Sequence, residues 1–232
     1  MVCMKEWVRQ YSSAFVVTAI TVGLVYQYAA VRYGVGGFST FNKALATSGL
    51  FLLGIVLLMG PLSRMFSLFD TWLKYRKEVG VLVFYLGFLH VFLSMFVLSG
   101  RGPWGIYLSS PWSAYPGLVA LTIMFLLIVI SFPYVEHTLG IRVWWRLQYW
   151  GARIAFLLIA IHMTVLKSSG WMTWLTTRGA GTTQGIPSLP PLAILVAVFS
   201  MFVLLVRLSE IFGVQVAKRI TQTSSLLTIG VI

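Results

Sequence analysis

The hydrophobic and polar positions follow a long-range pattern, in which six apolar runs are separated by short segments that contain charge, Pro or Gly. A helix that crosses the hydrocarbon core of a bilayer needs about 20 mainly apolar residues. The runs are therefore predicted to be membrane-spanning helices, and they cover residues 13–31, 44–62, 79–98, 116–135, 147–167 and 190–212. The predicted fold is an all-α integral membrane protein, a single transmembrane domain built as a six-helix bundle.

The composition supports this class. Hydrophobic residues make up 59% of the chain and charged residues 9%, whereas a soluble domain carries about 25% charged residues. Lys5 and Arg9 precede the first apolar run, as in a signal peptide, but the run is too long and lacks a small-residue cleavage site. We therefore expect it to be retained as the first helix. The single cysteine, Cys3, leaves no internal disulfide framework.

The net charge of +12 indicates how the helices are oriented in the membrane and does not indicate nucleic-acid binding. Lys and Arg are spread over the loops and form no dense basic tract. We therefore expect the protein to be surrounded by the lipid bilayer and to bind no nucleic acid. With both termini in the cytoplasm, eleven Lys and Arg residues lie inside and five outside. Because positive residues accumulate on the cytoplasmic side, both termini are predicted to be cytoplasmic.

Two of the three histidines lie within apolar runs, His90 in the third and His162 in the fifth. Ionisable residues within a membrane usually face the protein interior and mark functional sites. At 1.5 Å per residue, His90 is roughly 20 Å and His162 roughly 24 Å from the nearest inner charge. The two imidazoles are therefore expected at similar depth. His137 lies in a polar loop and is interpreted as solvated.

Small residues share the helix faces that carry these histidines, Gly87 with His90 and Ala155 with His162. Such faces leave room for a flat macrocycle, but they also serve close helix packing in membranes. Two imidazoles at equal depth favour a bis-histidine haem, a six-coordinate arrangement suited to electron transfer. The alternative is a pair of buried histidines that form hydrogen bonds with their neighbours.

Two basic residues, Arg101 and Lys167, lie at the outer ends of the third and fifth helices. They could pair with outward-pointing haem propionates, or they could simply anchor the helices at the interface. Arg153, within the fifth run, is interpreted as reaching the inner headgroups, with binding of an anionic cofactor or a partner helix as the alternative.

The largest inner basic group consists of Arg64, Arg76 and Lys77. The tendency of positive residues to lie on the cytoplasmic side is enough to explain this basic group, without a binding role. The alternative is that these residues meet a flavin phosphate, a quinone or an electron donor.

Several motifs carry a resemblance to a known family. They are Arg76-Lys77-Glu78-Val79-Gly80, Phe84-Tyr85 and Leu89-His90, followed by Leu139-Gly140, Trp144-Trp145-Arg146-Leu147 and Ala160-Ile161-His162. Over roughly residues 44–212 the chain resembles the ferric-reductase-like transmembrane family. It is most similar to the haem b-binding membrane subunits of bacterial methionine sulfoxide reductase systems, and more distantly to the membrane cores of NADPH oxidases and metalloreductases.

In two-haem members of that family, the third and fifth helices each carry two histidines. The resemblance therefore implies one haem b in the outer half of this chain, bound by His90 and His162. The inner ligand positions fall near Arg76 and on Gln148, which are not usual haem ligands. By the same resemblance, the inner half holds a flavin or quinone, or receives electrons from a partner.

The predicted function is that of a cytochrome b-type electron-transfer subunit of an oxidoreductase in the bacterial inner membrane. The chain has no room for a nucleotide-binding βαβ unit, so we expect a quinol or flavoprotein donor and a redox partner protein on the outer face. The alternative is a non-catalytic membrane subunit of a respiratory or photosynthetic complex, which packs or binds lipid or pigment. A transporter is disfavoured because the spans contain no acid and no broken-helix pair.

Overall fold

The computed structural model describes residues 2–98, 105, 111–180, 185–210 and 213. Within these ranges the chain is helical, with no strand. The elements are α1 (Val2–Tyr33), α2 (Phe38–Met65), the 3₁₀ helix η1 (Ser67–Tyr75), α3 (Arg76–Phe92), the π-helical segment η2 (Leu93–Val97), α5 (Pro111–Val129), α6 (Pro133–Leu139), α7 (Ile141–Thr177) and α8 (Leu192–Ser209).

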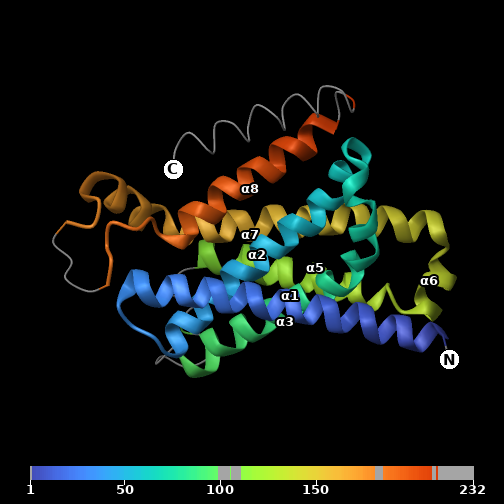
Figure 1. Cartoon of the computed structure of the whole chain (residues 1–232), viewed down its shortest axis with the longest axis horizontal. Coiled ribbons are helices and arrows are strands. Elements are labelled where there is room, and N and C mark those ends of the chain that lie inside the picture. Colours follow the sequence, from blue (N-terminus) through green and yellow to red (C-terminus); the bar gives the residue numbers. More distant parts are fainter. Residues whose placement is uncertain (1, 99–104, 106–110, 181–184, 211–212, 214–232) are drawn as a thin grey trace.

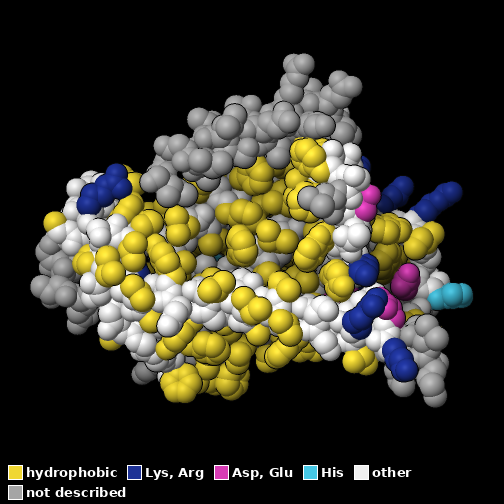
Figure 2. Space-filling view, in the orientation of Figure 1, with side chains coloured by type: hydrophobic (Ala, Val, Ile, Leu, Met, Phe, Trp, Pro, Cys, Tyr) yellow, Lys and Arg dark blue, Asp and Glu magenta, His cyan; other side chains and the backbone are white. Residues whose placement is uncertain are grey.

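Six helical stretches of the described chain are long and apolar enough to cross a membrane. The predicted six-helix membrane bundle is therefore confirmed. The long helices run back and forth along the long axis of the molecule, and α1 begins at the end where α8 stops (Figure 1). We call this the inner end, following the charge-based prediction. Figure 2 shows hydrophobic side chains across the middle of one face and many Lys and Arg side chains near the inner end.

Several helices extend beyond the predicted apolar runs. The clearest case is α7, which has 37 residues where the hydropathy pattern marks 147–167. At 1.5 Å per residue its length is about 55 Å, whereas the hydrocarbon core is about 30 Å thick. The apolar run therefore accounts for only the central part of α7, and the residues on either side continue the same helix.

The predicted span 116–135 ends earlier, because α5 stops at Val129 and a separate short helix, α6, begins at Pro133. Proline lacks an N–H group and is favoured in the first turn of a helix, where that group has no partner. Gly140 then separates α6 from α7 with a φ of 73°, a left-handed value that glycine adopts without strain. The predicted loop between spans four and five is therefore largely helical.

The third span changes its helical type just after His90. The α-helix α3 gives way at Leu93 to the wider turn of η2, which ends with a hydrogen bond from Leu98 N–H to the Leu93 carbonyl at 2.9 Å. Short π segments within helices occur frequently at functional sites. This one contains Ser94, which contacts α2 as described below.

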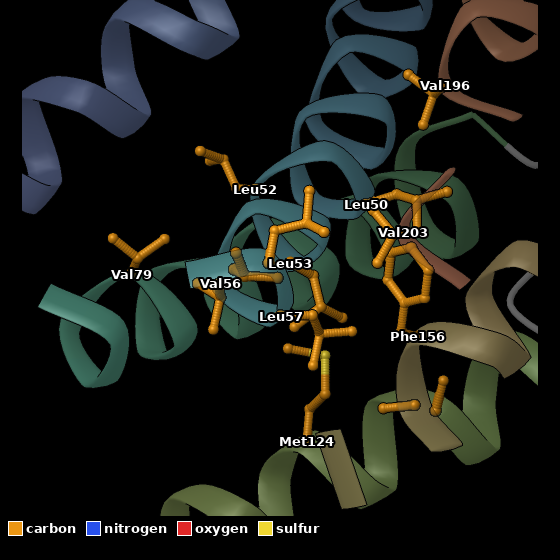
Figure 3. Packing of buried hydrophobic residues seen from close by; sticks show 14 of the residues in the cluster. Leu50, Leu52, Leu53, Val56, Leu57, Val79, Met124, Phe156, Val196 and Val203 are labelled. Atoms are coloured by element: carbon orange, nitrogen blue, oxygen red, sulfur yellow. The ribbon is translucent and has the colours of Figure 1, made fainter. Parts of the chain in front are cut away.

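The core is built around α2, the most buried of the six spans. α2 contacts α1, α3, α7 and α8. In Figure 3, Phe156 of α7 and Met124 of α5 point toward its central stretch, which contains Leu53 and Leu57. Close packing on the other side depends on Gly54, where a Cβ atom would lie 2.5 Å from Phe199 Cε1 of α8. α2 is therefore the central helix of the bundle, and α1, α3, α7 and α8 pack around it.

Candidate functional site

His90, near the end of α3, is partly buried and forms hydrogen bonds with a residue of α2. Its Nδ1 lies 2.9 Å from Asn42 Oδ1 and 3.2 Å from the backbone oxygen of the same residue. The Asn42 amide nitrogen donates to Ser94 Oγ at 2.8 Å. One asparagine thus contacts His90 of α3 and Ser94 of η2, one turn further along the third span.

His162, in the middle of α7, contacts α5 in a comparable way. Its Nδ1 forms a hydrogen bond with the backbone carbonyl of Ser113. The ring lies against Gly117, where a Cβ atom would be 3.1 Å from Nδ1, 3.2 Å from Cγ and 3.3 Å from Cε1. These distances are tighter than most contacts of real Cβ atoms, so the absence of a side chain at Gly117 gives the imidazole its place.

The partners of both Nδ1 atoms determine which nitrogen carries the proton. Carbonyl oxygens only accept hydrogen bonds, so each Nδ1 donates, and in the neutral ring each Nε2 then keeps its lone pair. Metal-binding histidines show this arrangement, in which one ring nitrogen donates to a carbonyl and the other binds the metal. The residues present therefore fit the role of axial haem ligands.

The two histidines come from helices that are not each other's packing partners. In the described part of the chain, α3 packs mainly against α2, and α7 mainly against α5. The imidazoles of His90 and His162 are still near enough for their charges to interact. This geometry presents two Nε2 atoms from separate helix pairs.

The other predicted site residues lie in different surroundings. Gly87 faces α5, since a Cβ atom there would be 3.4 Å from Leu121 Cδ1. Ala155 is fully buried in the hydrophobic core. Lys167 is exposed on the outer part of α7, within electrostatic range of His90. Arg101 lies outside the described residues.

A cavity of about 550 Å³ lies nearer the inner end, and neither His90 nor His162 lines it. Its walls come from α2, η1, α3, α5, α7 and α8. The floor is apolar and includes Leu53, Val56 and Met124. The basic and aromatic side chains that line it are Arg64, Lys74, Arg76, Lys77, Arg153, Arg207, Trp144, Trp145 and Tyr149. A concave site with an apolar floor and convergent polar groups is typical of a ligand-binding site.

One carboxylate, Glu210 at the end of α8, meets three of these arginines. It pairs with Arg207 at 2.9 Å, with Arg153 at 3.5 Å and with Arg64. Arg76 is also near, because a Cβ atom at Gly60 would be 3.7 to 3.9 Å from the guanidinium groups of Arg76, Arg207 and Arg64. Three guanidinium groups therefore pair with one carboxylate and a fourth lies near two of them, so the described cluster has an excess of positive charge.

One expectation about charge within the spans is wrong. Arg153 does not extend to the headgroups, because its side chain is 16% exposed and its guanidinium lies 3.2 Å from the centre of the Tyr149 ring and pairs with Glu210. Hydropathy cannot anticipate this, since the partner comes from another helix. α3 begins before the predicted span 79–98, and its first turn contains a buried acid, Glu78.

Arg76 and Gln148, which the resemblance associates with the inner half of the membrane, both line this cavity. The Gln148 amide donates to the Leu127 carbonyl at 2.9 Å and to Ser131 Oγ at 2.7 Å, so it is held against α5. Among the described residues there is also no group of three or more His, Cys, Asp and Glu side chains that could hold a metal ion.

The fold defines an integral membrane protein with six spanning helices. Residues 44–159, half of the chain, match the model of the ferric reductase like transmembrane component family, and the chain belongs to that family. A search of curated proteins finds no match. The matched range includes His90 and ends three residues before His162. Membership indicates an electron-transfer function in the membrane.

Proposed function

We propose that this protein is a membrane cytochrome b-type electron-transfer protein that holds one haem b between α3 and α7, with His90 and His162 as the axial ligands. The observation that carries the proposal is the matched environment of the two imidazoles. Each donates from Nδ1 to a carbonyl oxygen and presents an unprotonated Nε2. A haem with two imidazole ligands supplies one-electron chemistry and keeps no open coordination position.

The residues around the imidazoles have distinct roles in this proposal. Asn42 and the Ser113 carbonyl orient the two rings and keep Nδ1 protonated, while Gly117 leaves space for the His162 ring. Lys167 is placed to meet a propionate at the outer end, and Arg101 is proposed for the same role. Gly87 and Ala155 remain predicted neighbours of the macrocycle.

The inner cavity is proposed as the place where electrons enter. Its volume lies within the range of about 300–1,000 Å³ that is usual for ligand sites, and its basic and aromatic lining suits a flavin or a quinone. Gln148 and Arg76 occupy the positions where a second haem would need histidines, which supports a different group at this level. The donor is then a quinol or a flavoprotein, and the acceptor a partner on the outer face.

The same geometry supports a placement among relatives. A single bis-histidine site in the outer half favours kinship with the haem b-binding membrane subunits of bacterial methionine sulfoxide reductase systems, and hence a location in the bacterial inner membrane. In this interpretation the protein acts as a subunit, and its partner carries out the chemistry on the substrate.

The second candidate is a non-catalytic membrane subunit, and the small residues of α3 and α7 favour it. Gly87 faces Leu121, and a Cβ atom at Gly151 would lie 2.6 Å from Leu127 Cδ2. These glycines thus serve close packing against α5. In that case the two histidines would only satisfy their own hydrogen bonds.

The visible spectrum of the purified protein separates the two candidates. We expect a b-type signal in the reduced-minus-oxidised spectrum, and its loss in His90→Ala and in His162→Ala. His137→Ala is the matched control and should keep the signal, because His137 is exposed on α6. Absence of the signal from the unmodified protein, or a full signal in His162→Ala, would overturn the haem assignment.

A further inference from the structure

Asn42 is a buried polar residue near the beginning of α2, with 7% of its surface exposed. Burying an amide in an apolar environment costs free energy unless its donors and acceptors are paired. Here the oxygen faces His90 Nδ1 and the nitrogen donates to Ser94 Oγ. The amide therefore joins α2 to the third span through two side-chain hydrogen bonds, one to α3 and one to η2. The residue lies two positions before the range matched by the family model.

The backbone oxygen of Asn42 determines the orientation of the amide. This oxygen lies 3.2 Å from His90 Nδ1 and can only accept, so Nδ1 carries the proton. The amide must then face Nδ1 with its oxygen, and its NH₂ group donates to the Ser94 hydroxyl, which can accept or donate. The two oxygens of Asn42 hold the ring from the α2 side.

A side-chain substitution can change the hydrogen-bond acceptor of His90 Nδ1 but not that of His162 Nδ1. His162 Nδ1 is met by the backbone carbonyl of Ser113, which no side-chain substitution replaces. His90 Nδ1 is met by the side chain of Asn42, so the strength of this acceptor depends on the residue at position 42. A hydrogen bond from Nδ1–H to an acceptor raises the basicity of the other ring nitrogen, and a stronger acceptor raises it further.

We propose that Asn42 is a positioning residue for His90, which fixes the tautomer and orientation of the ring and tunes the reduction potential of the haem through the strength of its hydrogen bond. The inference rests on the proposed function, because it requires His90 to be an axial ligand. A more basic imidazole stabilises the ferric state relative to the ferrous state. A stronger acceptor at position 42 therefore lowers the midpoint potential, and loss of the acceptor raises it.

The test is a redox titration of the full-length protein, with the haem absorption as the readout. Asn42→Asp places a carboxylate against Nδ1 and should lower the midpoint potential. Asn42→Leu removes the side-chain acceptor and should raise the potential. The electron paramagnetic resonance spectrum of the ferric protein should shift as well, because its g-values report the axial ligands. A merely structural role would not move the potential in opposite directions in the two variants.

Ser48→Ala is the matched control, since Ser48 is a fully buried residue of α2 and its hydroxyl has no hydrogen-bond partner among the described contacts. Its potential should equal that of the unmodified protein. If Asn42→Leu fails to fold, the direction of the shift in Asn42→Asp decides. A bound haem whose potential is unchanged or raised in Asn42→Asp overturns the role of Asn42 and leaves the haem assignment intact. Absence of haem from the unmodified protein overturns both.

Discussion

Replacing Gly117 with alanine adds one methyl group where α5 passes the imidazole of His162. The new carbon would lie 3.1 Å from Nδ1, 3.2 Å from Cγ and 3.3 Å from Cε1 of the ring. Optimal separations between such heavy atoms are about 3.5 to 4.0 Å. The ring must therefore move by a few tenths of an ångström, and its Nδ1 is already in close contact with the Ser113 carbonyl on α5.

The cost follows from this geometry. Adding a methyl group to a well-packed site usually costs about 1–3 kcal/mol. If the displaced ring is an axial ligand, that cost appears in cofactor binding as an affinity about 5- to 150-fold weaker. We expect Gly117→Ala to retain less haem after purification and to show a perturbed ferric spectrum.

The measurement is the ratio of haem absorption to protein, together with the rate at which haem is lost to an acceptor protein. Gly170→Ala is a matched control on α7 itself, because a Cβ atom there has nothing within 4 Å. Equal haem content and equal loss rates in Gly117→Ala and the unmodified protein would refute the reasoning, since the His162 ring would then not be confined by α5.

Two predictions concern stability and need no cofactor. Gly54→Ala places a Cβ atom 2.5 Å from Phe199 Cε1 and should destabilise the contact of α2 with α8 by about 1–3 kcal/mol. The measurement is unfolding in mixed micelles, and unchanged stability would contradict the packing described for α2. Glu210→Gln removes the carboxylate that pairs with Arg207, whose side chain is 8% exposed, and should cost about 3 kcal/mol. Glu6→Gln, in an exposed pair, is its control and should change stability by less than about 1 kcal/mol; equal losses in both variants would show that the Glu210 cluster does not stabilise the inner end.

The positions of the helices could be predicted because the signal is local. A bilayer requires a certain length of apolar chain, and that length can be counted along the sequence. The hydropathy pattern did not predict the break between α5 and α6. Pro133 and Gly140 bound a separate short helix there, in a segment whose pattern predicts a single span followed by a loop. The similar depth expected for His90 and His162 follows in the same way from the rise of a helix, and it stays a prediction.

The neighbours of the site residues required the tertiary structure. Asn42 reaches His90 across 48 positions of the chain, and the Ser113 carbonyl reaches His162 across 49. No periodicity within one helix indicates which residue of another helix lies beside it. Gly117 gave no signal as a site residue for the same reason, since its importance lies in the ring that contacts it.

The sequence by itself determined the class of this protein, the number of crossings and the two histidines in apolar runs, because these follow from hydropathy and from spacing along single helices. The tertiary structure decided the proton positions on the imidazoles, the packing of the small residues against α5, and the joining of Arg64, Arg153 and Arg207 to Glu210. Each of these depends on contacts between helices, which form only when the bundle is assembled.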